Sequence, residues 1–304
     1  MGNRKQIKMD MNLPKLIENF GTNERCRKYL ELLRWENGVQ CPRCESGKIS
    51  PIKDRPQYDC DACHYQFSVT TGTVLHDTHL PLWKWFAAAY MIVEAKKGVS
   101  ANQLKRTLAV SYKTAWYLCH RIRKAMEDVN AKPLTGTVEV DETYLGGKAK
   151  GVGTGNYKPY KTLIVGALQR DGDVRIRVEK RANKATLHKF VADHCADETE
   201  KIYTDAHPGY TGIGDHNTTH ESVDHNIDEW VRGDVHTNGI EGVWSLLKRS
   251  IVGSYHQVSK KHLDRYLDEF QFRFNNRKNE FLFRDTIIKL IEAPTLTYKE
   301  LIAS

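Results

Sequence analysis

The chain has 304 residues, 40% hydrophobic and 28% charged, and its 46 Lys and Arg against 38 Asp and Glu give a formal net charge of +8. This apolar content excludes a wholly disordered chain, and the length accommodates two or three modules of ~100–200 residues. The positive surplus favours polyanionic partners, either nucleic acid or an acidic membrane face, without choosing between them.

Hydropathy and the number of cysteines predict the cellular compartment of the protein. The longest strongly apolar run, Trp85 to Val93, has nine residues, whereas a membrane-spanning helix needs roughly 20. No apolar run follows Arg4 and Lys5, so we expect no secretory signal. Seven cysteines, an odd number that contains two close pairs, form a poor disulfide framework. We therefore expect a cytoplasmic protein without membrane contact.

Helical and strand-forming patterns alternate along the chain. Apolar residues at helical spacing predict helices within 12–34 and 80–126, on either side of a Cys-, Gly- and Pro-rich stretch with short β-prone pieces. Beyond Pro133 come β-prone runs at 137–141, 162–168 and 174–178, a helix at 184–194, a strand that ends at residue 205, a run at 221–224 and helices from 238 onward. This order predicts an α/β layer around a mixed sheet, with the helix 261–276 packed on a neighbour.

Two cysteine pairs predict a metal site near the amino terminus. Cys41 and Cys44 form one C-x-x-C turn, Cys60 and Cys63 form another, and 15 residues separate the pairs. Each turn presents two sulfurs, and tetrahedral zinc takes four such ligands. Four buried core cysteines or two disulfides are the weaker alternatives. Because four protein ligands leave no open position, we expect one structural Zn²⁺.

A basic helical segment follows the cysteines. Between Lys96 and Met126 there are eight basic residues and no acidic ones. Ser100 and Ser111 are suitable caps for two helices joined by a short link, which is typical of a helix-turn-helix whose second helix enters a major groove. The competing interpretation is a solvated helical hairpin. We favour DNA contact, through Lys105, Arg106, Lys113, Arg121, Arg123 and Lys124.

Three acids occupy positions where an RNase H-like sheet would place metal ligands. Asp141 ends the first predicted strand and shares a face with Glu139, Asp205 ends a later strand, and Glu241 lies near the start of the helix 238–249. Lys248 lies two turns further along that helix. Carboxylates that converge in this way hold two Mg²⁺ about 4 Å apart, a pair that assists phosphodiester displacement.

Each acid also has a structural explanation. Asp141 is compatible with a surface acid at a strand end, and Asp205 with the first residue of a turn. Glu241 fits the third position of a capping box with Asn238 as N-cap. Glu142 and Asp234 are rival ligands by proximity alone.

Several motifs give the chain a family resemblance nearly from end to end. They are Arg34-Trp35, Cys41-Pro42-Arg43-Cys44, the runs 67–73 and 140–144 with Gly146-Gly147, Tyr203-Thr204-Asp205, and the stretch from His236 to Arg249, which is the most specific. With these the chain resembles bacterial insertion-sequence transposases that carry an amino-terminal zinc ribbon and a DDE catalytic domain, the ISXO-like group. The loop 146–161 is shorter than in many members, although Lys148, Lys150, Lys158 and Lys161 keep it positive.

The resemblance implies a function and assigns roles. It makes Asp141, Asp205 and Glu241 the three catalytic acids and metal ligands, with Lys248 as the accompanying basic residue, and it implies two catalytic Mg²⁺, or Mn²⁺ in their place. The implied activity is DNA transposition: binding of terminal inverted repeats, strand cleavage, and strand transfer into target DNA. The implied protein works at the bacterial nucleoid as a homodimer or larger assembly. A catalytically inactive DNA-binding derivative and a structure-selective metal-dependent nuclease are the alternatives.

The same resemblance divides the chain into five expected segments. They are an N-terminal helical segment (1–36), a zinc ribbon (37–75), a helical DNA-binding segment (76–132), an RNase H-like DDE catalytic domain (133–255) and a C-terminal helical segment packed on that domain (256–304).

Overall fold

The computed structural model describes residues 11–146, 161–214 and 216–303, and the chain divides into two compact units. The N-terminal unit comprises Met1–Glu127 with Lys278–Ser304, and the sheet unit comprises Asp128–Arg277. Among the described residues, no helix combines the length and the apolar character that crossing a bilayer requires.

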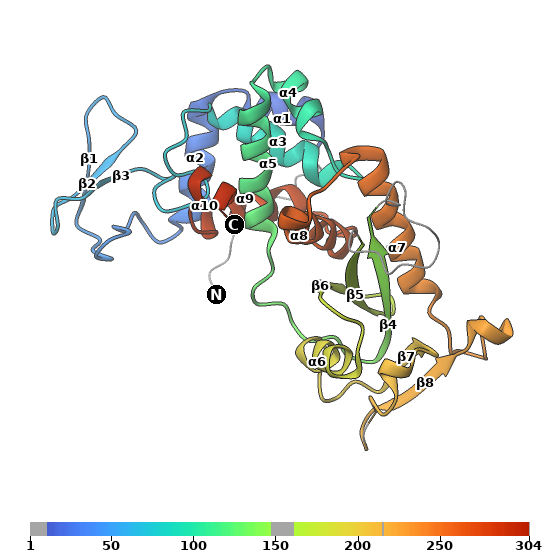
Figure 1. Ribbon diagram of the computed structural model, residues 1–304. Coiled ribbons are helices and arrows are strands. Elements are labelled where there is room, and N and C mark those ends of the chain that lie inside the picture. Colours follow the sequence, from blue (N-terminus) through green and yellow to red (C-terminus); the bar gives the residue numbers. More distant parts are fainter. Residues whose placement is uncertain (1–10, 147–160, 215, 304) are drawn as a thin grey trace. The chain divides into compact units, whose positions relative to one another are not determined.

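The N-terminal unit is helical, with a small sheet inserted after the second helix (Figure 1). Its helices are α1 (Leu13–Phe20), α2 (Asn23–Arg34), α3 (Leu82–Glu94), α4 (Ala101–Leu108), α5 (Tyr112–Met126), α9 (Leu282–Glu292) and α10 (Tyr298–Ala303). The inserted antiparallel sheet has the strands β1 (Ile49–Pro51), β2 (Tyr58–Cys60) and β3 (Gln66–Phe67).

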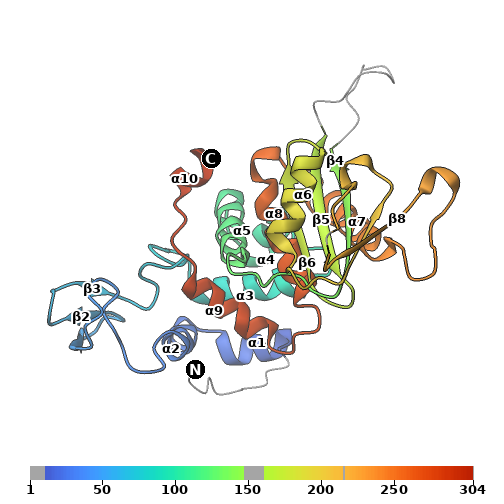
Figure 2. The same cartoon turned by 90° about the horizontal axis from the view of Figure 1, so that it is seen from below.

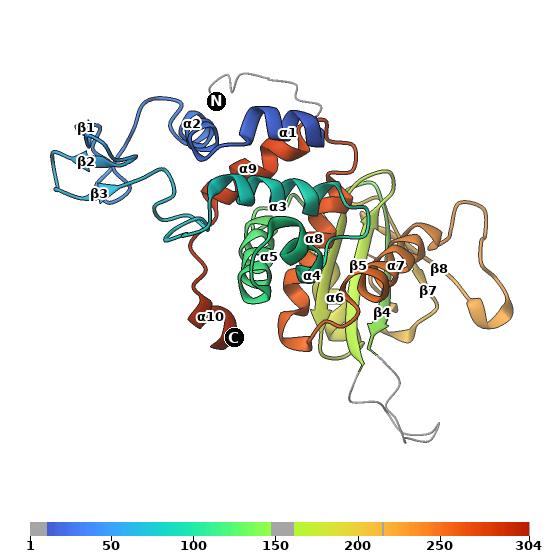
Figure 3. The same cartoon turned by 90° about the horizontal axis from the view of Figure 1, so that it is seen from above.

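The C-terminal residues 278–304 belong to this first unit, which differs from the expected segment 256–304. The reason is aromatic packing. The ring of Phe20 on α1 lies 5.0 Å from that of Phe86 on α3 and 5.8 Å from that of Phe283 on α9, measured between centroids. Figure 3 shows α9 running along α1 and α3. Only residues 256–277 group with the sheet unit.

The sheet unit contains the mixed sheet that the sequence predicts. Its strands are β4 (Thr137–Leu145), β5 (Thr162–Gln169), β6 (Val174–Glu179), β7 (Lys201–Asp205) and β8 (Thr219–Val223), in the order β6-β5-β4-β7-β8. β5 pairs antiparallel with β4 and β6, whereas β7 pairs parallel with β4 and β8. The long helices are α6 (Lys184–His194), α7 (Asn238–Ser250) and α8 (Leu263–Asn275), and short turns of other helix types lie at 208–210, 225–227, 251–255 and 260–262. This is the predicted RNase H-like fold.

Helices cover both faces of this sheet (Figure 2). Val138 and Val140 of β4 pack in a core with α6, on one face. Glu139 and Asp141 turn to the other face, where both contact α7, because successive side chains of a strand alternate. The strand therefore buries an apolar face and directs an acidic one at a helix. Most of the basic loop 146–161, with Lys148, Lys150 and Lys158, lies outside the described residues.

Candidate active site

Three carboxylates converge where β7 ends beside the middle of β4. The expectation that Asp141 ends its strand is wrong, because β4 continues to Leu145, paired with β5, whereas Asp205 is the last residue of β7. Asp141, Glu142 and Asp205 each offer an oxygen, and these oxygens all lie within 4.8 Å of one another. The parallel register explains the meeting: Glu139 pairs with Tyr203, so two residues further along Asp141 reaches the level of Asp205. Two of the three predicted acids are thus brought together by strand pairing.

Asp141 is held by a tryptophan from α7. The Trp244 indole Nε1 donates to Asp141 Oδ2 at 2.8 Å. The ring fits because Gly166, the partner of Asp141 on β5, has no side chain: a Cβ there would lie 2.4 Å from the Trp244 ring. Burial, followed by the negative charges of Asp205 and Glu142, raises the pKa of Asp141 to about 7. The site thus concentrates negative charge in a partly dehydrated place.

Glu142 is the member of the cluster that sequence reasoning left as a rival ligand. Its Oε2 accepts a hydrogen bond from Tyr210 Oη at 2.7 Å, and its Oε1 lies 3.9 Å from His207 Nε2. Burial raises the pKa of this carboxyl, against the lowering effect of the Tyr210 hydroxyl. The other rival, Asp234, is exposed and lies outside the cluster. Proximity to Asp141 along the chain was the only signal for Glu142.

Glu241 is not part of this cluster of oxygens. Its Oε1 accepts from Thr237 Oγ1 at 3.3 Å and lies 3.6 Å from His225 Nε2. The capping-box explanation is wrong, because the N-cap is Thr237 and not Asn238. Glu241 lies one helical turn before Trp244, the residue that contacts Asp141. Lys248 is exposed two turns beyond Glu241 on α7.

The acids form a donor set suited to divalent cations. The three carboxylates accept hydrogen bonds from neutral donors: the Trp244 indole, the Tyr210 hydroxyl and, for Asp205, the backbone N–H of His207 at 3.1 Å. Among the described residues, no Lys or Arg side chain forms an ion pair with them. Carboxylate oxygens are the ligands that Mg²⁺ and Mn²⁺ prefer. A divalent cation would supply the positive charge that this cluster lacks.

The four predicted cysteines form a second candidate metal centre. Cys41 Sγ lies 3.7 Å from Cys63 Sγ, and Cys44 Sγ lies 3.6 Å from Cys60 Sγ. These separations exceed a disulfide bond and match the roughly 3.8 Å between sulfurs that share a tetrahedral zinc with Zn–S bonds of about 2.3 Å. Cys26, in contrast, is a buried core residue of α2. The cluster therefore fits a structural zinc ion.

The basic segment folds as two helices joined by a tight link, α4 and α5. Ser100 and Ser111 cap them as expected, accepting from Gln103 N and Thr114 N, both at 3.1 Å. Ala109 closes α4 in a left-handed conformation.

Exposure separates the predicted DNA contacts into two groups. The side chains of Lys105, Arg106 and Lys113 are exposed. Arg121 and Arg123 are buried, with Arg121 donating to the carbonyl of His76 at 2.7 Å. The prediction of DNA contact by these two arginines does not fit their burial. All six residues from 118 to 123 are buried, so this part of α5 is covered on every side.

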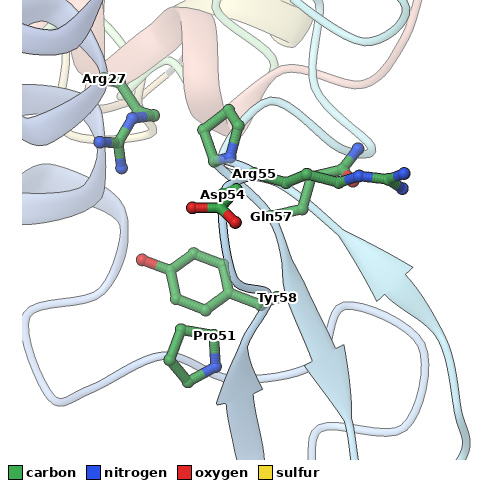
Figure 4. A pocket seen from close by; sticks show the side chains of 7 residues that line it. Arg27, Pro51, Asp54, Arg55, Gln57 and Tyr58 are labelled. Atoms are coloured by element: carbon green, nitrogen blue, oxygen red, sulfur yellow. The ribbon is translucent and has the colours of Figure 1, made fainter.

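A hollow of about 370 Å³ lies beside the cysteine-bearing sheet. Figure 4 shows Arg27 of α2 and Tyr58 of β2 on opposite sides of it. Arg27 forms an ion pair with Glu31 at 2.8 Å, so its guanidinium also stabilises its own helix. Sequence reasoning gave no sign of this hollow, because it forms only where α2 meets the small sheet.

Comparison with protein families gives two matches. The ISXO2-like transposase domain family matches residues 133–275, and the transposase zinc-ribbon domain family matches residues 21–66. The chain is also 31% identical over 276 residues to an uncharacterised protein in transposable element ISH50 of Halobacterium salinarum, which covers 84% of this chain and 92% of that protein.

Comparison with solved structures gives more distant neighbours. The Mos1 strand transfer complex is 12% identical, with a TM-score of 0.31, over 72% of this chain and 77% of that chain. The mariner Mos1 paired-end complex with Mg is also 12% identical, with a TM-score of 0.26, over 68% and 76% of the two chains.

Proposed function

Because this chain belongs to the ISXO2-like transposase family, we propose that it is the DDE transposase of an insertion sequence. It would bind the terminal inverted repeats, cut the DNA at their ends and transfer the freed strand into target DNA. The observation that carries this proposal is the meeting of Asp141, in the middle of β4, and Asp205, at the end of the neighbouring parallel strand β7, in an RNase H-like sheet. We also propose that the host is a bacterium and that the protein acts in its cytoplasm, beside the nucleoid.

Asp141, Asp205 and Glu241 would hold two Mg²⁺, or Mn²⁺ in their place. When bound, such a pair activates the attacking oxygen and stabilises the leaving oxygen of a phosphodiester displacement. The donor chemistry supports this, since a third carboxylate, Glu142, is already within 4.8 Å of the first two. Glu241 would complete the set from α7.

The protein side chains would orient the acids and position the DNA. Trp244 fixes the orientation of the Asp141 carboxylate through its indole N–H. Lys248, exposed two turns beyond Glu241, would contact a phosphate near the scissile bond rather than act as a base. Water would attack first to free a 3′-hydroxyl, and this hydroxyl would then attack the target phosphodiester, with no covalent link between protein and DNA.

The N-terminal unit would hold the ends of the insertion sequence. One structural Zn²⁺ on Cys41, Cys44, Cys60 and Cys63 would stabilise the ribbon. The exposed Lys105, Arg106 and Lys113 would contact the phosphate backbone. Lys124, in the last turn of α5, would add to these contacts although it forms an ion pair with Glu127. The division into segments 1–36, 37–75, 76–132 and 133–255 stays part of this proposal. Two ends must be joined together, so we propose at least a homodimer on DNA.

An in vitro assay with Mg²⁺ and DNA carrying the native ends tests the proposal. We expect the wild type to cleave and join, and Asp205→Ala to bind the ends without cutting. Asp234→Asn is the matched control, because this acid is exposed outside the cluster and its loss should leave cleavage unchanged. Binding without cleavage by the wild type would favour the inactive DNA-binding alternative. Cleavage without joined products would favour the nuclease.

A further inference from the structure

Glu139 is a buried acid next to the candidate active site that has no role in the chemistry described above. Its side chain is 1% exposed. Oε1 accepts from Arg170 Nε at 2.9 Å, and Oε2 accepts from the backbone N–H of Ile240 at 3.0 Å. Since burying a carboxylate is costly unless it is paired and hydrogen-bonded, both contacts are needed to keep it there.

The second contact replaces the normal cap of α7. Thr237 is the N-cap, but its side chain makes no capping hydrogen bond. Its hydroxyl donates to Glu241 Oε1 instead, at 3.3 Å. The first-turn amide of Ile240 is therefore satisfied from β4, by a negative charge at the positive end of the helix. Gly239 allows this approach, because a Cβ there would lie 2.7 Å from Glu139 Oε2.

Arg170 extends the same contact to the chain that leads into α7. One of its terminal nitrogens lies 2.8 Å from the carbonyl oxygen of Asp234 and 3.2 Å from that of His236. Its guanidinium also lies over the Tyr203 ring, 4.8 Å from the centroid. Glu139 thus holds both the first turn of α7 and, through Arg170, the residues just before it.

The Glu139–Ile240 hydrogen bond is the first of two hydrogen bonds between β4 and α7, which we call rungs. The second is the Asp141–Trp244 hydrogen bond. The rungs are two residues apart on the strand, about 6.8 Å, and four residues apart on the helix, about 6.0 Å, so the two lengths match. Glu241 lies between the rungs on the helix. Together they fix the helix against the strand in both direction and register.

We propose that Glu139 is a positioning residue that fixes α7, and with it Glu241, against the strand that carries Asp141, so that Glu241 can join Asp141 and Asp205 in divalent-cation binding. This inference rests on the proposed function, because it assigns Glu241 to the metal site. Without the first rung, α7 would keep its apolar packing on β5 and the Trp244 hydrogen bond to Asp141, but its first turn, which contains Glu241, would lose its hydrogen bond to β4. The helix could then turn or slide, and Glu241 would lose its fixed distance from Asp141.

Binding of Mn²⁺ to the full-length, zinc-loaded protein tests this role, measured by calorimetry and electron paramagnetic resonance. Glu139→Gln replaces one acceptor oxygen with a donor, so either Arg170 or Ile240 loses its partner. Gly239→Ala displaces the same rung from the helix side and leaves Glu139 intact. Glu269→Gln is the matched control, since Glu269 is another fully buried acid of the sheet unit and pairs with Arg273 on α8.

We expect Glu139→Gln and Gly239→Ala each to weaken Mn²⁺ binding by about tenfold, the lower end of the range for residues that orient metal ligands. In a Glu241→Gln background, Glu139→Gln should cause no further loss, because its effect passes through Glu241. Glu269→Gln should lower the unfolding temperature and leave Mn²⁺ affinity unchanged.

Two results would overturn the inference. One is an equal loss of affinity from Glu139→Gln with and without Glu241, which would mean that Glu139 acts on Asp141 or on stability alone. The other is no loss in either rung variant. A wild type that binds no Mn²⁺ at the acids would instead refute the proposed function itself, and with it this role of Glu139, before any variant is compared.

Discussion

Replacing Asp141 with asparagine should stabilise the metal-free protein at alkaline pH. Asparagine keeps an oxygen that accepts from Trp244 Nε1, so the hydrogen bond to α7 survives. The substitution removes the negative charge, which burial and the neighbouring Asp205 and Glu142 make unfavourable. The variant thus separates the charge of Asp141 from its structural contact.

The magnitude follows from the pKa of Asp141, which rises from 3.8 to about 7 in the folded protein. At pH values between 3.8 and about 7, the folded chain holds a proton on Asp141 that the unfolded chain releases. The contribution of Asp141 to the free energy of unfolding therefore falls as the pH rises, and it becomes constant above about pH 7. A pKa raised by about three lowers the free energy of unfolding by about 4 kcal/mol at pH 8 and by less than about 2 kcal/mol at pH 5. Because 1 kcal/mol moves the melting temperature of a 150-residue unit by about 2–4 °C, we expect Asp141→Asn to melt about 10 °C higher than the wild type at pH 8.

Calorimetric melting of both proteins at pH 5 and pH 8, with chelator and with Mn²⁺, is the assay. The advantage of Asp141→Asn should shrink at pH 5, and Mn²⁺ at pH 8 should raise the melting temperature of the wild type alone. An advantage of equal size at both pH values would refute the reasoning. A less stable variant at pH 8 would show that the carboxylate makes a net favourable interaction in the metal-free protein.

Three further predictions concern packing, zinc and DNA. Gly166→Ala should lower the free energy of unfolding by about 1–3 kcal/mol in urea denaturation, because its Cβ would meet the Trp244 ring, whereas Gly242→Ala, with open space around it, should be neutral or slightly stabilising. Cys44→Ser should lower the bound zinc below about half an equivalent in metal analysis and loosen the ribbon, visible as lost amide protection; full zinc occupancy would contradict a four-cysteine site. Lys113→Glu should weaken binding to the terminal repeats and reduce its salt dependence, whereas Arg123→Ala should chiefly lower the melting temperature, since Arg123 is buried. Unchanged salt dependence for Lys113→Glu would exclude it from the interface.

Local patterns account for the parts of the site that sequence reasoning could predict. Each C-x-x-C turn brings two sulfurs close together by itself, since only two residues separate its cysteines, and the two turns together supply four sulfurs. Serines at positions 100 and 111 cap helices for a local reason as well. Strand alternation was enough to place Asp141 and Glu139 on one face, opposite Val138. Each of these depends on residues a few positions apart, so the sequence carries the information directly.

Contacts between distant segments account for what sequence reasoning missed. Glu142 joins Asp205 because β4 and β7 pair in parallel, in a register that brings the end of β7 level with the middle of β4, and its partner Tyr210 lies 68 residues away. Arg121 was predicted to face DNA because a basic run gives a charge and not a direction, and the packing of α5 turns it inward. The same packing of helices drew residues 278–304 into the N-terminal unit.

The sequence by itself therefore determined the zinc ribbon, the mixed α/β sheet and two of the three acids that meet, Asp141 and Asp205, because motif spacing and side-chain periodicity are local properties of a chain. Only the tertiary structure decided which acids meet, which basic residues stay exposed, and how α7 is held against β4. Glu139 reaches Ile240 across 101 positions of sequence, and Asp141 reaches Trp244 across 103. Such pairings depend on strand register and on the space left by glycines, which a pattern of single residues does not specify.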